Sequence, residues 1–343
     1  MRSTTVHKYL EELETIPLLD VRSPAEFQKG HIPSAMNLPL FSDAERAEVG
    51  TLYKQKSKET AMMKGLEIAG AKMSWYVKEA KRLVDGSNIA LHCWRGGKRS
   101  SSMATLLEFT GNKTTVIEGG YKAYRNYILH AFSNELSKLI VIGGATGSGK
   151  TELLHELKKR GEQVVDLEKI AHHKGSAFGA LGEKSQPTVE QFENDLFEVI
   201  RKLDTKKRIW VENESNSIGR VFIPAGFWDQ LCQAFLIELE VPFENRVERL
   251  IRIYADFPKE KLIGSLEKIR KRLGGLNIKN AIAAYEANDM ETAAGIALKY
   301  YDKAYLHATQ KKKFKRKESL NTHLLDTNEI ADQLIQLAQR YDY

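Results

Sequence analysis

The chain has 343 residues, of which 42% are hydrophobic and 28% are charged, so it is long enough to bury the cores of two globular domains. Its 52 Lys and Arg outnumber its 45 Asp and Glu, and the formal net charge of +7 suits a polyanionic partner without requiring one. The two cysteines, Cys93 and Cys232, lie far apart in dissimilar contexts, which argues against a disulfide framework or a zinc cluster and favours a reducing compartment. No apolar run reaches the roughly 18 residues of a membrane span, and residues 1–7 lack the apolar core of a signal peptide. We therefore expect a cytoplasmic protein without a membrane partner.

The N-terminal segment predicts a short strand over 16–22, followed by a helical turn. Ser23 is the expected N-cap of this turn, and Glu26 stands three residues later, which is the pattern of a capping box. We expect Asp20 and Arg22 to form a buried ion pair. Helical spacing of apolar residues then indicates helices over 45–55 and 75–84.

Cys93 lies between an apolar run at 87–91, which predicts a strand, and a helical pattern at 101–109. We therefore expect its thiol in a tight strand-to-helix loop, where backbone N–H groups and the helix start favour a thiolate. The residues that complete this anion-binding loop are Trp94, Arg95, Gly96, Gly97, Lys98 and Arg99. Cys93, Arg95 and Arg99 are the candidate catalytic residues, because the cations favour both a thiolate and an anion bound beside it. The alternative for a lone cysteine is a buried thiol that packs as a small hydrophobe.

Residues 20–39 resemble the signature of the rhodanese-like domain. The matching positions are Asp20-Val21-Arg22, Glu26-Phe27, Gly30-His31-Ile32-Pro33, Ala35 and Asn37-Leu38-Pro39. The active-site cysteine of these domains opens a loop like that at Cys93, and residues 114–125 resemble their terminal strand and Gly-Gly turn. The resemblance implies that Cys93 carries sulfur or selenium as a persulfide or perselenide.

The spacing between His92-Cys93 and Arg99-Ser100 also fits the cysteine-dependent phosphatases. In those enzymes a thiolate attacks phosphorus, and the arginine binds the phosphoryl oxygens. Both chemistries need the same anion-binding loop, so the loop alone does not separate them. The rhodanese signature upstream favours sulfur or selenium transfer.

A continuous apolar run at 139–143 predicts a buried parallel strand, and a Walker A motif at 144–151 and a helical pattern follow at once. The predicted phosphate-binding residues are Gly144, Gly147, Ser148, Gly149, Lys150 and Thr151. Their backbone N–H groups can wrap a diphosphate, Lys150 neutralises its outer oxygens, and Thr151 is the candidate ligand of a Mg²⁺ ion. The motif does not identify the phosphate compound that binds.

Two later strand patterns end in acidic residues. Asp166 and Glu168 end the first pattern, and Glu212 and Glu214 end the second, where a Walker B acid is expected. Ligands of open parallel sheets gather at the carboxyl ends of strands. These four residues are therefore candidate acids, bases or metal ligands.

The candidate RNA or ligand contacts of this half of the chain are His172, His173, Arg246, Arg249, Lys313, Lys315 and Arg316. The two histidines have no Cys or His partners at zinc-site spacing, and an ordinary surface role is their alternative. The arginines belong to a basic stripe on a predicted helix over 243–254, and residues 311–317 place six cations around Phe314. RNA contact and a solvated surface are both open for this basic run. The pattern over 259–306 is helical, and an amphipathic helix over 329–340 should pack back on the domain.

A rhodanese-like segment followed by a Walker A segment resembles the family of bacterial tRNA 2-selenouridine synthases over almost the whole chain. Further matching segments are 175–179, Glu214-Ser215 and Ile218-Gly219. The resemblance implies an α/β protein with a rhodanese-like domain over 1–133. It also implies a P-loop NTPase-like domain with a parallel sheet and a helical, basic C-terminal part over 134–343.

The resemblance also implies a reaction. The family converts the wobble 2-thiouridine of tRNA, of the 5-methylaminomethyl type, to 2-selenouridine with selenophosphate, through an S-geranyl intermediate made from geranyl diphosphate. We expect Cys93 to carry selenium as a perselenide and the P-loop domain to bind geranyl diphosphate, with Mg²⁺ at Thr151. The region around Gly65 and Leu66 is a candidate lining for the prenyl chain.

The tRNA anticodon region is the expected partner, and a selenophosphate-producing enzyme is a further candidate. The alternative is a rhodanese-type sulfurtransferase or a cysteine-dependent phosphatase fused to an ATP-binding domain. The sequence does not indicate an oligomeric state.

Overall fold

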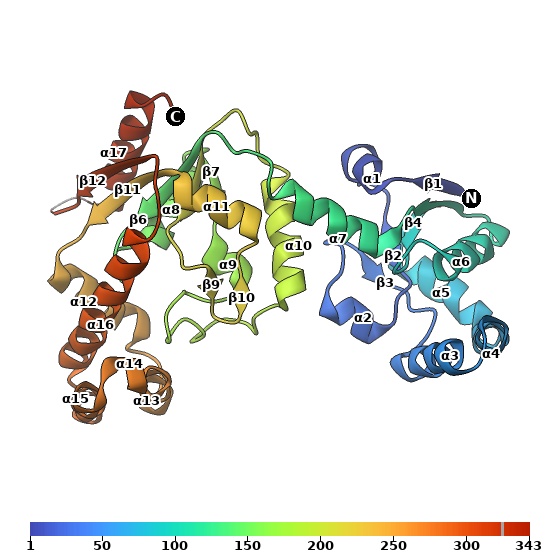
Figure 1. The fold of residues 1–343 in the computed structure, drawn as a ribbon, viewed down its shortest axis with the longest axis horizontal. Coiled ribbons are helices and arrows are strands. Elements are labelled where there is room, and N and C mark those ends of the chain that lie inside the picture. The colour runs from blue at the N-terminus through green and yellow to red at the C-terminus, as the bar shows by residue number, and fades with distance from the viewer. Residues whose placement is uncertain (324–325) are drawn as a thin grey trace. The chain divides into compact units, whose positions relative to one another are not determined.

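The computed structural model describes residues 1–323 and 326–343, and the chain divides into two compact units, Met1–Ala131 and Phe132–Tyr343 (Figure 1). Each unit contains a five-stranded sheet in which every neighbouring pair of strands is parallel. Helices connect the strands, because parallel neighbours cannot be joined by a tight hairpin. The expected α/β class is confirmed.

The sheet of the first unit has the strand order β1-β5-β4-β2-β3. Its strands are β1 (Arg2–Thr4), β2 (Leu18–Asp20), β3 (Met36–Asn37), β4 (Asn88–His92) and β5 (Lys113–Ile117). Its helices are α1 (Val6–Glu12), α2 (Pro24–Lys29), α3 (Asp43–Gln55), α4 (Lys58–Gly70), α5 (Met73–Leu83), α6 (Lys98–Phe109) and α7 (Gly120–Ala131). The helices predicted near 45–55 and 75–84 correspond to α3 and α5, whereas α4 has no counterpart among the predicted elements.

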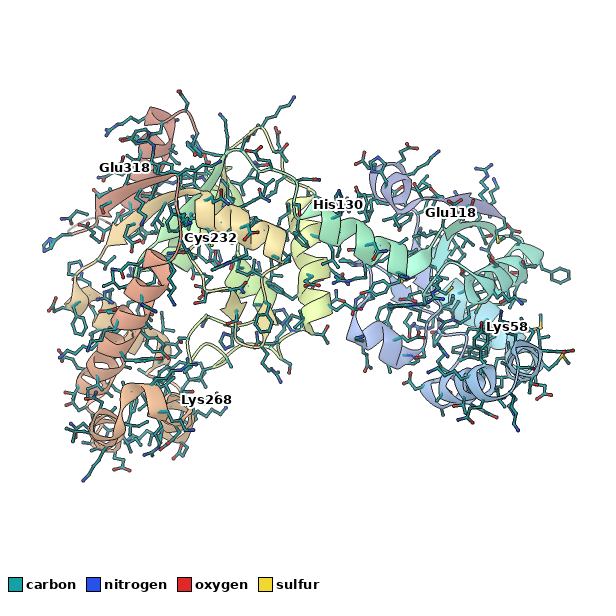
Figure 2. The ribbon with its side chains drawn as sticks, viewed as in Figure 1. Lys58, Glu118, His130, Cys232, Lys268 and Glu318 are labelled. Carbon is teal, nitrogen blue, oxygen red and sulfur yellow. The ribbon has the colours of Figure 1, made fainter. Side chains whose placement is uncertain are left out.

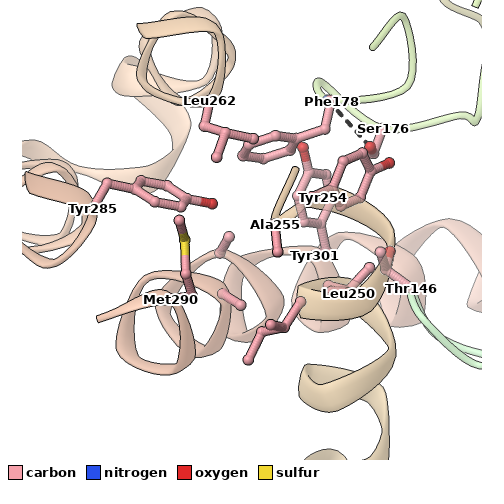
Figure 3. A pocket seen from close by; sticks show the side chains of 13 residues that line it. Thr146, Ser176, Phe178, Leu250, Tyr254, Ala255, Leu262, Tyr285, Met290 and Tyr301 are labelled. Carbon is pink, nitrogen blue, oxygen red and sulfur yellow. Dashed lines mark hydrogen bonds between the residues drawn. The ribbon is translucent and has the colours of Figure 1, made fainter. Parts of the chain in front are cut away.

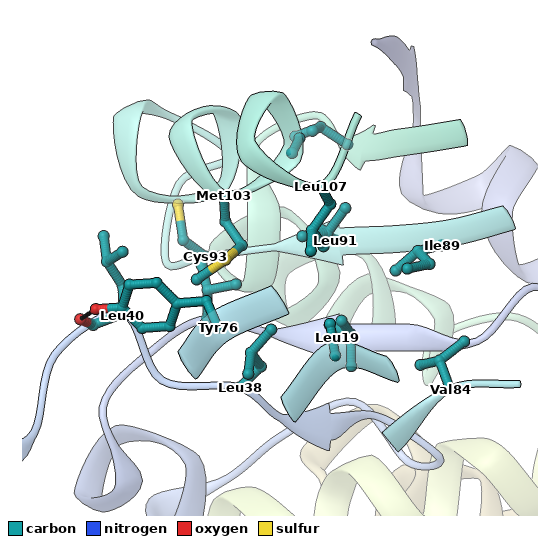
Figure 4. Close-up of a cluster of buried hydrophobic side chains, with 14 of the residues drawn as sticks. Leu19, Leu38, Leu40, Tyr76, Val84, Ile89, Leu91, Cys93, Met103 and Leu107 are labelled. Atoms are coloured by element: carbon teal, nitrogen blue, oxygen red, sulfur yellow. Dashed lines mark hydrogen bonds between the residues drawn. The ribbon is translucent and has the colours of Figure 1, made fainter. Parts of the chain in front are cut away.

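The core of the first unit gathers side chains from β2, β4, α5 and α6 (Figure 4). Leu19, Leu91 and Leu107 are fully buried in it, and Cys93 closes one end of this cluster. The predicted capping box is confirmed, since the Ser23 side chain accepts the Glu26 N–H and the Glu26 carboxylate accepts the Ser23 N–H. The packing of β4 therefore fixes the point at which the cysteine loop leaves the sheet.

The main sheet of the second unit has the order β12-β11-β6-β8-β7. The strands of this unit are β6 (Leu139–Gly143), β7 (Gln163–Val165), β8 (Ile209–Glu212), β9 (Ser217–Ile218), β10 (Val221–Phe222), β11 (Phe235–Glu240) and β12 (Arg316–Asn321), of which β9 and β10 form an antiparallel pair. Its helices are α8 (Lys150–Lys159), α9 (Leu167–Ala171), α10 (Val189–Ile200), α11 (Ala225–Gln233), α12 (Phe243–Tyr254), α13 (Lys259–Lys268), α14 (Arg270–Leu273), α15 (Gly275–Glu286), α16 (Met290–Gln310) and α17 (Thr327–Arg340).

The helical part predicted over 259–306 corresponds to α13–α16, and it has a hydrophobic cluster of its own that includes Leu266 and Ile278. After α16 the chain returns to the sheet. There β12 pairs with β11, and α17 packs against the sheet and α8 through Ile330 and Leu334, as expected for an amphipathic final helix. Within the described ranges, no helix has the length and apolar character needed to cross a membrane.

Candidate active sites

The predicted strand-to-helix loop is present, and it runs from Cys93, just after β4, to Gly97, just before α6. Two groups donate hydrogen bonds to the Cys93 Sγ, each at 3.3 Å: the backbone N–H of Gly97 and the hydroxyl of Ser100. Burial of the sulfur by itself would raise its pKa, but the bonds from Ser100 and the loop N–H groups, together with the charge of Arg99, lower the pKa of Cys93. The side chain is only 3% exposed, so its polar surroundings, and not solvent, stabilise the thiolate.

The turn at Gly119 and Gly120 holds the loop from its other side. The Cys93 carbonyl accepts the Tyr121 N–H, and the Trp94 carbonyl accepts the Lys122 N–H, both at 2.9 Å. A Cβ atom on Gly120, which has a φ of 56°, would lie 2.2 Å from the Cys93 carbonyl oxygen, so the close approach requires glycine. These contacts fix the orientation of the two carbonyls.

Arg95 and Lys98 are exposed, whereas Arg99 is partly buried and forms an ion pair with Glu26. Behind the loop, the predicted Asp20–Arg22 pair is confirmed as an ion pair of 2.6 Å between fully buried side chains. The Arg22 guanidinium also lies 3.8 Å from the centre of the Tyr121 ring. The first unit therefore has a buried ion pair between Asp20 and Arg22, and the loop exposes Arg95 and Lys98 to solvent.

A groove of about 1660 Å³ adjoins Cys93 within the first unit. It is lined by apolar side chains from α3, α4, α5, α6 and the segment before α3, among them Phe41, Val49, Met62, Leu66, Met73, Tyr76, Met103 and Leu106. The same lining contains the cations Arg46, Lys54, Lys58, Arg95, Lys98 and Arg99. Gly65 and Leu66, which the family resemblance suggested as a lining for a prenyl chain, both belong to it. The groove beside Cys93 therefore has both an apolar and a cationic surface.

In the second unit the Walker A segment connects β6 to α8, as predicted. Gly147 and Gly149 have φ values of 81° and 84°, which L side chains rarely adopt, and they turn the backbone around the loop. Lys150 Nζ donates to the Gly144 carbonyl at 2.7 Å. The buried Ser148 hydroxyl has no hydrogen-bond partner among the described residues, so a phosphate oxygen would satisfy it.

Acidic side chains stand beside this loop. Thr151 donates to the Glu168 carboxylate at 3.0 Å, and the Glu168 N–H donates to the Glu212 carboxylate at 2.9 Å. Burial and the neighbouring Glu214 carboxylate raise the pKa of Glu168 to about 8, and burial raises the pKa of Glu214. Asp166 makes other contacts: its side chain accepts the Lys169 N–H, which caps α9, and it forms an ion pair with His155.

Two of the predicted arginines reach the phosphate loop from α12. Arg249 Nη1 donates to the Gly147 carbonyl at 3.0 Å, and Arg246 Nη1 donates to the Thr146 carbonyl at 3.2 Å. Arg246 is also held by Asp302 at 2.7 Å. These positions bring two positive charges to the loop, whereas Arg252 of the same helix is 70% exposed.

An apolar cavity of about 40 Å³ adjoins the phosphate loop at Thr146 (Figure 3). The rings that surround it belong to Phe178, Tyr254, Tyr285 and Tyr301, and its aliphatic lining includes Leu250, Leu262 and Met290. Its residues come from α12, α13, α15, α16 and the loop that contains Ser176. The helical part of this unit therefore places a small apolar cavity beside the Walker A loop.

The basic run at 311–317 is not uniformly exposed. Lys312 is buried, donates to Asn213 Oδ1 at 2.6 Å and to the Glu214 carbonyl at 2.7 Å, and lies 4.4 Å from the Trp228 ring centre. Burial lowers the pKa of Lys312 to about 8. Lys313 and Lys315 are exposed, and Arg316 begins β12 with its side chain over the Tyr341 ring.

The remaining candidates have mainly local contacts. His172 ends α9 in the left-handed region, and its Nδ1 lies 3.0 Å from the Ser185 carbonyl oxygen, while His173 is buried and burial lowers its pKa. Cys232 lies on α11 (Figure 2), where burial raises the pKa of its thiol. Of the two cysteines, only Cys93 has surroundings that favour a thiolate.

Tyr305 is a polar residue that sequence reasoning missed. Its hydroxyl donates to Glu238 at 2.8 Å and accepts the Gly144 N–H at 2.7 Å, so it supports the first residue of the phosphate loop. Its position within a long helical pattern gives no signal of this contact. Within the described ranges, including the acidic residues beside the phosphate loop, no group of three or more His, Cys, Asp or Glu side chains is arranged to hold a metal ion.

The sequence profile of the tRNA 2-selenouridine synthase AAA domain matches residues 137–333, and that of the rhodanese-like domain matches residues 4–127. A tRNA 2-selenouridine synthase of Shewanella frigidimarina is 35% identical over 335 residues, which cover 88% of this chain and 90% of that protein. Proteins of the same name from Nitrosomonas europaea and Sulfurovum sp. are each 36% identical, and the matches cover 75% and 80% of this chain and 67% and 80% of theirs. These matches confirm the expected pair of rhodanese-like and P-loop domains and the enzyme class. The chain belongs to the tRNA 2-selenouridine synthase family.

Proposed function

We propose that this protein converts the wobble 2-thiouridine of tRNA to 2-selenouridine in two steps, using geranyl diphosphate at the phosphate loop and selenophosphate at the Cys93 loop. The observation that carries the proposal is the presence in one chain of a cysteine loop and a Walker A loop, each beside an apolar space. Because the proposed substrate is tRNA, we also propose that the protein acts in the cytoplasm.

In the first step the sulfur of 2-thiouridine attacks C1 of geranyl diphosphate. The C–S bond forms, the C–O bond breaks, diphosphate leaves and the uridine N3 proton passes to water. The loop N–H groups, Lys150 and Arg249 are suited to stabilise the negative charge that develops on the leaving diphosphate. Alkylation turns the C2 sulfur from a thiocarbonyl into a thiolate leaving group.

Thr151 and Glu168 are the residues we assign to a Mg²⁺ ion. Their side-chain oxygens are 3.0 Å apart and are the hard donors that Mg²⁺ prefers, while phosphate oxygens and water would complete its shell. When bound, the ion would neutralise charge on the diphosphate oxygens.

In the second step the selenium of selenophosphate is already at the selenide level. A perselenide formed by attack of Cys93 on selenium would therefore have to expel phosphite or consume an oxidant. Attack of the Cys93 thiolate on phosphorus needs neither, because the S–P bond forms, the P–Se bond breaks and selenide leaves. We therefore replace the expected perselenide with a cysteinyl phosphate, which water converts back to the thiol and inorganic phosphate.

The selenide released at the loop then attacks C2 of the S-geranyl uridine. The C–Se bond forms, the C–S bond breaks and geranyl thiolate leaves. The spacing from Cys93 to Arg99 and the Ser100 hydroxyl at 3.3 Å from the sulfur are compatible with attack on phosphorus, and the electron balance of the step is what favours it. The exposed Lys313 and Lys315 are available for contacts to tRNA phosphates.

Nucleoside mass spectrometry tests the proposal with full-length protein and a 2-thiouridine-containing tRNA. Wild type with geranyl diphosphate should yield S-geranyl uridine, and added selenophosphate should convert it to 2-selenouridine. Cys93→Ser should stop at the geranylated nucleoside, and Lys150→Ala should fail at geranylation yet convert RNA that is already geranylated. Lys159→Ala on the exposed end of the same helix should behave as wild type.

Absence of S-geranyl uridine with wild type would refute the assignment of the phosphate loop. Loss of both steps in a folded Cys93→Ser variant would refute the division between the two sites. Phosphorus NMR decides the fate of selenophosphate, since inorganic phosphate supports attack on phosphorus and phosphite would restore the perselenide.

A further inference from the structure

We infer that the groove beside Cys93 binds the prenyl chain of the S-alkylated uridine, so that selenium exchange selects alkylated RNA over RNA that lacks the chain. This inference rests on the proposed function and adds a substrate-binding site in the first unit. The groove would hold the chain after its transfer to sulfur.

The size of the groove is the first support. Selenophosphate is no larger than phosphate, and a loop of a few residues suffices to hold it. The groove beside that loop has a volume of about 1660 Å³, which exceeds the roughly 300–1,000 Å³ typical of pockets for drug-sized ligands. It therefore has room for a nucleobase together with a ten-carbon chain.

The character of its lining is the second support. Leu66 and Met73 line the groove although they are 57% and 50% exposed, so they present apolar surface that the protein itself leaves uncovered. Met62, Met73 and Met103 bring three flexible, unbranched side chains to the lining. Such side chains adapt to irregular apolar partners, and a prenyl chain is one.

The cations in the groove lining indicate that the prenyl chain it binds is attached to RNA. Lys54, Lys58 and Lys98 belong to the same lining and are exposed, so they can contact a polyanion without losing their hydration. A neutral terpene would gain nothing from these cations, whereas a prenyl chain attached to RNA uses both surfaces at once. The occupant that fits is therefore the S-prenyl uridine within its RNA.

The position of the groove gives it a role in the reaction. Cys93, Arg99 and Leu66 are part of one lining, so a chain held there brings the C–S bond of the uridine to the place where selenide is released. Holding the two reactants together favours the exchange by proximity. The geranyl thiolate that leaves would already lie in an apolar site.

The experiment uses full-length protein and two synthetic anticodon stem-loops, one with S-geranyl and one with S-methyl 2-thiouridine at the wobble position. Dissociation constants and single-turnover selenation with selenophosphate are measured for both RNAs. Wild type should bind the S-geranyl RNA at least about tenfold more tightly than the S-methyl RNA, since burying even two or three methylene groups gives this factor. The ratio between the two RNAs reports the chain contact and is independent of contacts to the rest of the RNA.

Leu66→Gln and Met73→Gln should each reduce this ratio about threefold or more, because a polar amide replaces apolar contact surface. Met63→Gln is the matched control: Met63 is 56% exposed on α4, as Leu66 is 57% exposed, but it lies outside the groove lining. This variant should keep the wild-type ratio. Because all three side chains are exposed, the substitutions should leave the core intact.

The outcomes separate the inference from the proposed function. If wild type does not convert the S-geranyl RNA, the proposed function fails. If wild type converts both RNAs but binds them equally, or if Leu66→Gln and Met63→Gln change the ratio alike, the groove is not the prenyl site although the proposed function stands.

Discussion

Arg99 of α6 is held by Glu26 of α2, with 2.7 Å between the guanidinium Nη1 and the carboxylate Oε2, although the two residues are 73 positions apart. The same carboxylate accepts the Ser23 N–H at 3.1 Å and so also caps α2. One side chain therefore joins the rhodanese-like signature near the N-terminus to the arginine of the cysteine loop. Burial would raise the pKa of Glu26, but the bond and charge of Arg99 lower it, so the pair is ionised at neutral pH.

Glu26→Gln should lower kcat/KM for selenation about tenfold or more, because Arg99 loses a charge-assisted partner that fixes its orientation. Glutamine can still cap α2, so the helix should persist. Glu45→Gln is the matched control, since Glu45 fills the same capping-box position in α3 but pairs with Lys72. Equal losses in the two variants would show that the effect arises from helix capping and not from Arg99.

Ser100→Ala should move the pH dependence of Cys93 alkylation by iodoacetamide to higher pH. The Ser100 hydroxyl donates to the sulfur and lowers its pKa, so the thiolate of wild type persists to lower pH than an ordinary thiol. Removing the donor raises the pKa and reduces the thiolate fraction at neutral pH. Ser102→Ala, which removes a hydroxyl bonded to the Lys98 carbonyl at 2.7 Å, should leave the midpoint unchanged. An unshifted midpoint in Ser100→Ala would contradict this assignment.

Arg249→Gln should raise the KM for geranyl diphosphate about tenfold, as expected for loss of one charge-assisted contact at the phosphate loop. The Arg249 guanidinium is 3.0 Å from the Gly147 carbonyl oxygen and is 22% exposed. Arg252→Gln changes the same residue type on the same helix at a 70% exposed position and should stay within about twofold of wild type. The KM of each variant is measured from the rate of diphosphate release. A similar increase in the two variants would show that the effect comes from the net charge of α12 and not from the contact of Arg249.

Lys312→Met should lower the free energy of unfolding by about 2 kcal/mol, because Asn213 Oδ1 and the Glu214 carbonyl lose a buried donor. Lys313→Met, at the exposed neighbouring position, should change stability little and weaken tRNA binding instead. Denaturant unfolding and RNA titration separate the two effects. If the two variants lose stability equally, the buried contacts of Lys312 do not contribute as described.

The stability of wild type relative to Lys312→Met should also depend on pH. Burial lowers the pKa of Lys312 from 10.5 to about 8 in the folded protein, so between these values the unfolded chain binds more protons than the native chain. The stability of wild type should therefore rise relative to the variant as the pH increases from 8 to 10.5. If the free energy of unfolding of wild type falls or stays constant relative to that of Lys312→Met over this range, the pKa of Lys312 is not lowered by burial as described.

Local patterns predicted much of this structure because their causes are local. The capping box at Ser23, the turn at Cys93 and the Walker A loop each depend on residues a few positions apart, and the structure contains all three elements. Strand β12 escaped prediction because Arg316–Asn321 is mostly polar and exposed, and its pairing with β11 depends on residues about 80 positions earlier.

The polar contacts around the sites were less predictable. Lys312 and its neighbours share one basic run, and only the fold decides that Lys312 turns inward to Asn213, 99 positions earlier. Tyr305 likewise supports Gly144 across 161 positions. Composition and local spacing do not indicate which residues meet across such distances. The two loops could therefore be predicted from the sequence, whereas the contacts of Lys312 and Tyr305 could not.

The turn at Gly119 and Gly120 also bears on how the protein is made. All residues from Cys93 to Ser100 leave the ribosome before residues 119–122, yet the Cys93 and Trp94 carbonyls are oriented by the N–H groups of Tyr121 and Lys122. A nascent chain that ends before Gly119 thus contains every residue of the thiolate loop but lacks the contacts that shape it. The reactivity of the cysteine would therefore appear only near the end of the synthesis of the first unit, when α7 (Gly120–Ala131), its last helix, begins to form.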